Sequence, residues 1–149
     1  MFVALIVVLS AGLFAGAALY VSLVEHPARV ACGTEVAVTE FGPSYKRGAV
    51  LQASLAAIGT VAAVFQWTLH GSSYDLAGAV LLGSAIPFTL LVILPTNRRL
   101  LDSRLDRTSL EAAQLLQRWG RLHAVRTGTG VLAFLLFTWR LIDATTSAL

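Results

Sequence analysis

Apolar residues occupy four long stretches of the chain, at about 1–24, 48–67, 76–94 and 124–141, and polar residues collect between them. A helix that rises 1.5 Å per residue crosses the roughly 30 Å hydrocarbon core of a bilayer in about 20 residues. The stretches therefore predict an all-α fold, in which four transmembrane helices form a bundle. We expect residues 1–149 to form a single membrane domain.

The composition supports the prediction of a membrane protein. Hydrophobic residues make up 56% of the chain and charged residues only 13%, against about 25% charged residues in ordinary globular proteins. The mean hydropathy is +0.75. The first stretch lacks the basic segment that opens a signal peptide, so we interpret it as a retained span. We expect an integral membrane protein in the inner (plasma) membrane of a bacterium.

Prolines and glycines predict where the first loop lies. Pro27 is expected to end the first span, because a proline disfavours the helical conformation of the residue before it. Residues 28–44 are predicted to form a loop in which Gly33 and Gly42 interrupt regular structure. Pro43 suits the first turn of the helix that follows.

The later helices carry their own signals. Pro87 lies within the third span and is expected to kink it. Thr108-Ser-Leu-Glu111 matches a capping box, so a helix is predicted to begin there. Its first part, at about 111–122, is amphipathic and is expected to extend the fourth helix beyond the membrane.

Basic residues predict the topology. Arg29, Lys46 and Arg47 flank the first loop, seven more basic residues fall within 98–126, and the turn at 70–75 has none. An even number of spans places both basic segments on one side, which the positive-inside rule assigns to the cytoplasm. Both termini are then expected outside. This topology accounts for the net charge of +3, so nucleic acid is not an expected partner.

Polar side chains concentrate at the helix ends that an up-down bundle gathers on the cytoplasmic side. These ends carry Glu25, His26, Tyr45, Lys46, Arg47, Asn97, Arg98, Trp119, His123 and Arg126. The opposite ends carry only His70, Asp75, Arg140 and Asp143. The asymmetry predicts a polar pocket that opens toward the cytoplasmic face of an apolar bundle.

The chemistry of this pocket has more than one interpretation. A histidine such as His123 or His26 with a nearby carboxylate, Glu25, can act as a general base near neutral pH. Asn97 and Arg126 can stabilise an oxyanion or enolate. Alternatively, Glu25, His26 and His123 can ligate a transition metal.

A purely structural role is open for each residue. Glu25 can pair with Arg126 or Arg98, because charges inside a membrane usually find partners. Asn97 can cap the third helix. Trp119 can belong to the aromatic belt at the membrane interface.

Three segments combine small, aromatic and polar residues in a characteristic order. They are Gly12-Leu-Phe-Ala-Gly16 leading to Tyr20 and Glu25-His26-Pro27-Ala-Arg29, then Pro95-Thr-Asn97-Arg98, and finally Trp119-x-x-x-His123-x-x-Arg126. Together they resemble the anthrone oxygenase-like family of small four-helix membrane proteins. The similarity covers essentially the whole chain.

This resemblance implies a membrane oxidoreductase, a monooxygenase that needs no cofactor. It would use O2 to oxidise a hydrophobic phenolic or enolisable substrate. His123 or His26 would then remove a proton, and Asn97 and Arg126 would hold the developing enolate oxygen.

The substrate contacts that the resemblance implies are aromatic and basic. Tyr20 and Trp119 would line an apolar slot, and Arg98 would also bind the substrate. The expected partners are this hydrophobic small molecule and the surrounding membrane lipid.

Two other functions stay open. The protein can be a non-enzymatic membrane subunit that binds lipid or a partner helix, because Gly12 and Gly16 form a small-xxx-small pair that lets helices approach closely. Association into a homo-oligomer is open for the same reason. The protein can also be a metal-binding oxidoreductase with Glu25, His26 and His123 as ligands.

Overall fold

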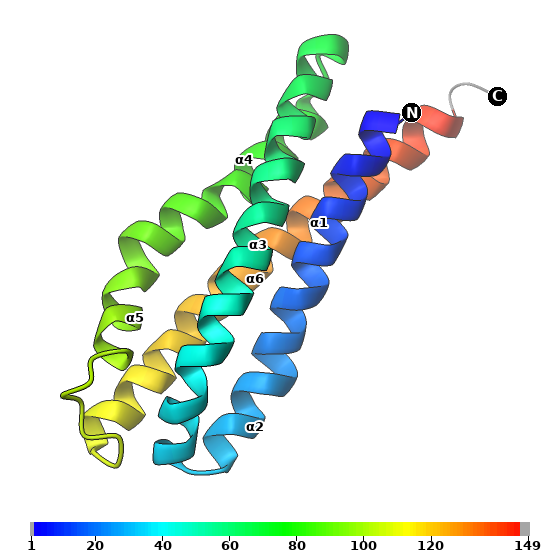
Figure 1. Ribbon diagram of the computed structural model, residues 1–149. Coiled ribbons are helices and arrows are strands. Elements are labelled where there is room, and N and C mark those ends of the chain that lie inside the picture. Colours follow the sequence, from blue (N-terminus) through cyan, green and yellow to red (C-terminus); the bar gives the residue numbers. More distant parts are fainter. Residues whose placement is uncertain (1, 147–149) are drawn as a thin grey trace.

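The computed structural model describes residues 2–146, and these form a bundle of four helical spans (Figure 1). The spans are, in order, α1 (Phe2–Tyr20) with η1 (Val21–Glu25) and α2 (His26–Ala31), then α3 (Thr34–His70), then α4 (Ser73–Phe88) with η2 (Thr89–Ile93) and α5 (Leu94–Leu100), and last α6 (Leu110–Thr146). The predicted all-α fold with four spans is confirmed. The ends of the predicted domain, residue 1 and residues 147–149, lie outside the described residues.

The helices run up and down, and α1 and α4 each pack against both α3 and α6. The core between them is made largely of alanines and a few large side chains, of which Phe14, Leu82 and Phe137 are almost fully buried. Small residues permit this close packing. A Cβ atom at Gly78 or Gly130 would clash with a phenylalanine ring of a neighbouring helix.

The turn at 32–33 and the loop at 101–109 lie at the same end of the bundle (Figure 1), which we call the basic end because most Lys and Arg residues lie near it. At the other end, α3 and α4 pack side by side around Gly71. Toward the basic end, α3 and α5 diverge (Figure 1).

The predicted loop over 28–44 is wrong, because α3 already begins at Thr34. Gly33 makes the turn with a φ of 96°, a backbone conformation that glycine adopts without strain. Pro43, which we expected in a first turn, lies inside α3. Phe41 is completely buried in the core at the basic end, and this packing outweighs the helix-breaking effect of the proline.

Pro27 does not end the first span, because the helix continues through α2. Pro27 follows the π-helix η1, and Pro95 follows the π-helix η2 in the same way. A proline ring collides with the carbonyl group four residues earlier. A π-helical turn is wider, so it accommodates the ring while the helix continues. Figure 1 shows that the third span, which also contains Pro87, is bent in its middle.

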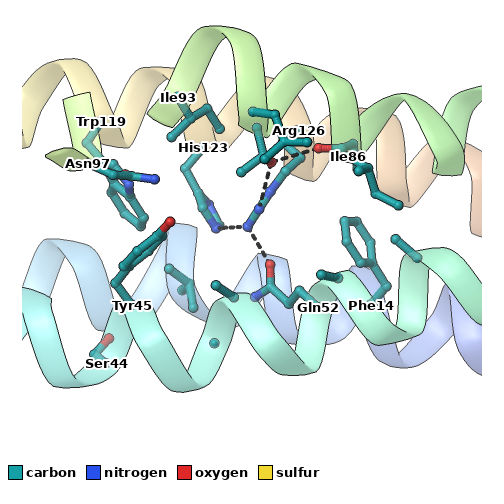
Figure 2. A pocket seen from close by; sticks show the side chains of 18 of the residues that line it. Phe14, Ser44, Tyr45, Gln52, Ile86, Ile93, Asn97, Trp119, His123 and Arg126 are labelled. Atoms are coloured by element: carbon teal, nitrogen blue, oxygen red, sulfur yellow. Dashed lines mark hydrogen bonds between the residues drawn. The ribbon is translucent and has the colours of Figure 1, made fainter. Parts of the chain in front are cut away.

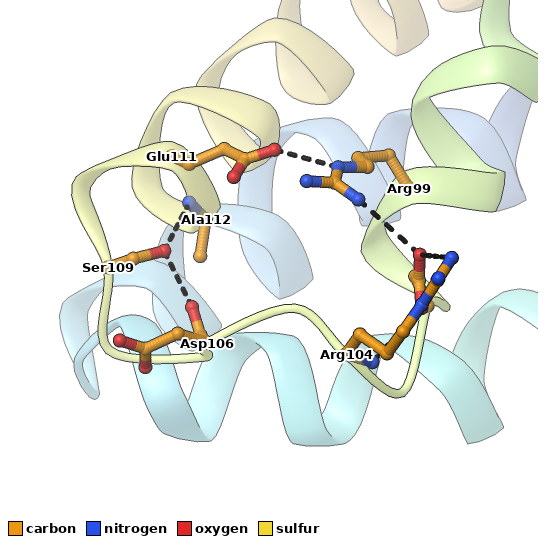
Figure 3. A network of polar contacts seen from close by, with 7 residues as sticks. Arg99, Arg104, Asp106, Ser109, Glu111 and Ala112 are labelled. Atoms are coloured by element: carbon orange, nitrogen blue, oxygen red, sulfur yellow. Dashed lines mark hydrogen bonds and ion pairs between the residues drawn. The ribbon is translucent and has the colours of Figure 1, made fainter.

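The loop at 101–109 positions the start of α6 (Figure 3). Ser109 Oγ accepts a hydrogen bond from the Ala112 amide at 3.2 Å. Thr108 instead donates its hydroxyl proton to Asp106, at 2.7 Å. The N-cap is therefore Ser109, one residue later than the predicted capping box, because Asp106 engages the Thr108 side chain.

Ion pairs also hold this loop against the helix ends (Figure 3). Arg99 pairs with Glu111 at 2.7 Å and with Asp102 at 3.4 Å. Hydrogen bonds from the Arg104 side chain and backbone hold the pKa of Asp102 below its ordinary value. Glu111 is thus used by Arg99 and does not close a capping box.

The amphipathic start of the fourth helix is present and is continuous with the membrane-spanning part of α6. Leu116 and Trp119 face the core, whereas Arg118 and Arg121 are exposed. This extension brings Trp119 and the residues after it into the bundle at the basic end.

Candidate functional site

A cavity of about 190 Å³ lies between α3 and the η2–α5 segment, in the half of the bundle near the basic end (Figure 2). Most of its lining is apolar, from residues such as Phe14, Ile86 and Ile93. The polar side chains that line it are Arg29, Ser44, Tyr45, Gln52, Thr89, Asn97, His123 and Arg126. An apolar cavity with a few polar groups is typical of a site for a small organic molecule.

His123 is held in one tautomeric state by its neighbours. Its Nε2 atom lies 2.8 Å from the Arg126 guanidinium, which can only donate, so Nε2 accepts this hydrogen bond. The proton of a neutral imidazole is then on Nδ1, which lies 2.9 Å from Ser22 Oγ. Ser22 in turn lies 2.8 Å from Thr127 Oγ1. His123, 2% exposed, is therefore oriented with its Nε2 lone pair on the Arg126 side.

Arg126 carries a positive charge toward the cavity without a carboxylate partner. Its guanidinium also donates to Gln52 Oε1, and to Thr89 Oγ1 at 3.2 Å. Its Nε has no hydrogen-bond partner among the described residues. The hydrogen-bond partners of Arg126 are thus neutral, whereas buried charges in a membrane are usually paired. An anionic oxygen in the cavity would supply the missing charge.

Trp119 forms the wall of the cavity at its basic end. It is 5% exposed, and its ring stacks on His123 with centroids 4.7 Å apart. His26 contacts another part of the same ring at 5.1 Å, and Phe41 meets it edge-on at 5.3 Å. Trp119 is therefore a cavity residue and not an interfacial one. His26 does not line the cavity.

Glu25 belongs to an ion cluster beside the cavity, and its ion-pair partner is Arg29 and not a histidine. It pairs with Arg29 and accepts a hydrogen bond from Ser44 at 2.6 Å. Arg29 also pairs with Glu40 at 2.8 Å and is 6% exposed. The partners considered for Glu25, Arg126 or Arg98, are thus not the ones it has. The cluster joins α2 to α3.

The remaining predicted site residues divide between the cavity and the surface. Asn97 is fully buried and lines the cavity. Its side chain makes no hydrogen bond with any residue of 2–146, so it does not cap a helix. Tyr20 is 58% exposed and lies in a separate groove between α1 and α3. Arg98 is exposed as well. We had expected both Tyr20 and Arg98 to contact the substrate beside Trp119, but neither residue lines the cavity.

Several residues of the site were not predicted from the sequence. Ser22, Gln52, Thr89 and Thr127 hold the His123–Arg126 pair, here meaning the two side chains and the hydrogen bond between them. Ser22, Gln52 and Thr89 are single neutral polar residues in apolar stretches, and Thr127 directly follows Arg126. A polar residue in an apolar stretch was the available signal, and it does not distinguish a functional side chain from one that bonds its own helix.

The metal-binding alternative is wrong for the three residues proposed. Within residues 2–146, no group of three or more His, Cys, Asp or Glu side chains is arranged to hold a metal ion. Glu25 is engaged by Arg29, and His123 Nε2 by Arg126. His26 packs against the Trp119 ring. The three side chains therefore do not form a ligand set.

The cavity reaches the outer surface of the bundle within a membrane-spanning region. Leu90 on η2 lines it and is 57% exposed, and Ala53 on α3 lines it and is exposed as well. Both residues belong to helices that are long and apolar enough to cross a membrane. An opening at this position would face the lipid.

The fold and the site together define a four-helix integral membrane protein with an internal cavity that contains a buried histidine–arginine pair. The chain matches the family model described as anthrone oxygenase over residues 41–136, more than half of its length. The protein therefore belongs to the anthrone oxygenase family.

The match includes Asn97, Trp119, His123 and Arg126. It is shorter than the whole-chain similarity that we expected, because residues 1–40 and 137–149 lie outside it. Comparison with curated proteins and with solved structures gave no match.

Proposed function

We propose that the protein is a membrane oxidoreductase that uses O2 to oxidise a hydrophobic phenolic or enolisable substrate, such as an anthrone, inside this cavity. The observation that carries the proposal is the His123–Arg126 pair. It presents a base, and a cation without a carboxylate partner among the described residues, to a largely apolar cavity. Membership of the anthrone oxygenase family supports the same chemistry.

The reaction begins when the substrate oxygen replaces His123 as a partner of Arg126. The Nε2 lone pair is then free to accept the acidic proton of the substrate. The resulting enolate oxygen stays on the guanidinium, which stabilises its charge. Without such an anion the imidazolium of His123 would lie directly beside Arg126, and the two cations would repel each other.

Oxidation then follows with balanced atoms. The carbanionic carbon of the enolate forms a bond to O2 and transfers electrons to it. The peroxide anion takes up the proton from the His123 imidazolium to give a hydroperoxide, which regenerates the base. Loss of water breaks the O–O bond and the remaining C–H bond at that carbon. The carbon becomes a carbonyl group, and one oxygen atom of O2 leaves as water. The residues around the cavity bind and orient the substrate during these steps, and they exclude water.

Ser22 and Thr127 have a positioning role in this scheme. Ser22 accepts the hydrogen bond from Nδ1 and is held in turn by Thr127, so the ring keeps one orientation. The same hydrogen bonds stabilise the imidazolium after proton transfer. Trp119 covers the face of the ring.

We also propose the location and orientation of the protein. The bundle would lie in the inner membrane of a bacterium with its basic end toward the cytoplasm, because the Lys and Arg residues near the 32–33 turn and the 101–109 loop follow the positive-inside rule. A substrate dissolved in the membrane would enter beside Leu90.

Oxygen uptake by the protein in lipid nanodiscs, with emodin anthrone as substrate, tests this function. We expect uptake by the wild type and a loss of about 10²–10⁴-fold in kcat for His123→Ala, the range for removing a general base. His70→Ala changes an exposed histidine at the other end of the bundle and serves as the matched control. Equal uptake by the wild type and His123→Ala would refute the role of the base.

The opening beside Leu90 also suits a second function, that of a membrane subunit that binds lipid. In that case the nanodisc protein would consume no oxygen with emodin anthrone. Mass spectrometry of the detergent-purified protein would then find lipid retained by the wild type and lost when Ile86→Trp fills the cavity.

A further inference from the structure

The amide of Asn97 is the least satisfied polar group of the cavity. Its side chain is fully buried, and neither Oδ1 nor Nδ2 has a hydrogen-bond partner in the part of the chain that the structure describes. Buried polar groups nearly always have a partner, so each exception needs an explanation. Among the described residues, the indole Nε1 of Trp119 is also buried without a partner, and both side chains line the cavity.

These unpartnered groups lie away from Arg126. The charged group near the Trp119 ring is Arg29, which is paired with Glu25 and Glu40. Arg126 binds Thr89, and Asn97 comes eight residues later in the same helical span, which corresponds to roughly 10 Å along the axis. In Figure 2, Asn97 and Arg126 lie on either side of His123. Asn97 is therefore too far along the cavity to share an oxygen atom with Arg126.

We propose that Asn97 is a specificity-determining residue that binds a hydroxyl group at the end of the substrate remote from the oxygen held by Arg126. The proposal rests on the proposed function, because it takes the occupant of the cavity to be the substrate. A hydroxyl group both donates and accepts. It can donate to Oδ1 while it accepts from Nδ2 or from the indole of Trp119, and so satisfies groups that the protein leaves free.

The substrate class follows from the two ends of the cavity. An ionisable oxygen binds at Arg126, a flat apolar body lies along Ile86, Ile93 and the Trp119 ring, and a hydroxyl group reaches Asn97. A fused aromatic molecule with a hydroxyl group on an outer ring meets these requirements. Asn97 then selects the substrate and does not hold the enolate, the role that the family resemblance had implied for it.

Two anthraquinones provide the test, because they bind without turnover. Emodin and chrysophanol share one skeleton, and chrysophanol lacks one outer-ring hydroxyl group of emodin. We would measure binding through the fluorescence of Trp119, in a nanodisc-embedded variant in which the other two tryptophans, Trp67 and Trp139, are replaced by phenylalanine. Both of these lie outside the cavity lining.

We expect this parent variant to bind emodin about tenfold more tightly than chrysophanol, the value of one well-formed hydrogen bond to an otherwise unsatisfied group. Asn97→Leu should reduce the preference to less than about twofold. Gln66→Leu is the matched control, since Gln66 also has a buried, unpartnered amide oxygen but does not line the cavity. It should leave the preference unchanged.

Asn97→Leu should also raise the Tm of the empty protein by a few degrees, because it removes an unsatisfied buried amide. If Asn97→Leu folds poorly, Asn97→Val is the second variant for the binding measurement. Equal binding of both quinones by the parent, or a preference kept in the folded Asn97 variants, would overturn the proposal. Failure to consume oxygen with any anthrone would refute the proposed function but not the binding preference, so the two failures are distinguishable.

Discussion

Replacement of Arg126 by methionine gives the sharpest prediction for activity. The structure places the guanidinium against three neutral groups, His123, Gln52 and Thr89. In the proposed reaction it moves from His123 to the enolate oxygen, so it is the donor that stabilises the developing charge. Removal of one such donor costs about 2.7–4 kcal/mol of transition-state stabilisation, or about 10²–10³-fold in kcat.

The stability of the same variant should change much less than its activity. Arg126→Met loses hydrogen bonds to neutral partners, each worth about 1.5–3 kcal/mol. It also removes a positive charge that no carboxylate compensates, and the desolvation of such a charge costs several kcal/mol. These effects have opposite signs, so we expect the free energy of unfolding to change by no more than about 2 kcal/mol.

An oxygen electrode with nanodisc-embedded protein and emodin anthrone gives kcat and KM for each variant. Arg121→Met is the matched control, because Arg121 lies on the same helix but is exposed. Arg126→Lys should recover only part of the activity, since an ammonium group lacks the planar fork of donors. A folded Arg126→Met protein with the kcat of the wild type would refute the reasoning.

Two further predictions concern the ion cluster and the mouth of the cavity. Arg29→Met should lower the free energy of unfolding by about 1–3 kcal/mol, less than for a fully buried pair because its two carboxylate partners are partly exposed; denaturation in mixed micelles measures this, and an equal loss for the exposed Arg98→Met would contradict it. Leu90→Trp should lower kcat/KM for membrane-dissolved emodin anthrone about tenfold and leave kcat unchanged. Leu91→Trp, which substitutes an exposed neighbour outside the cavity lining, should have no effect, and equal rates for both variants would exclude entry at this position.

The convergence of Asn97, Trp119, His123 and Arg126 was predictable from the sequence. Helical spacing places Trp119, His123 and Arg126 on one face of the fourth helix, and an up-down arrangement brings the end of the third span next to it. Both inferences depend only on the number of spans and on the regularity of α6, which is uninterrupted from Leu110 to Thr146.

The first span could not be predicted in the same way. The residues expected in the site, Tyr20, Glu25 and His26, lie just before, within and just after the π-helix η1. A π-helical turn adds one residue, which rotates everything after it by about 100° relative to a continuous α-helix. Hydrophobic spacing does not reveal such a turn, so a face that begins at Gly12 cannot be extended to Glu25.

The same irregularity explains how the site is held. Ser22 belongs to η1 and bonds His123, and Thr89 belongs to η2 and bonds Arg126. Each side chain of the His123–Arg126 pair is thus held by a hydroxyl group from another helical span, and in each case this hydroxyl group lies on a π-helix that precedes a proline. These two bonds can persist while the substrate oxygen displaces the bond between Nε2 and the guanidinium. The prolines at 27 and 95 therefore act on the site through the backbone, although neither lines the cavity.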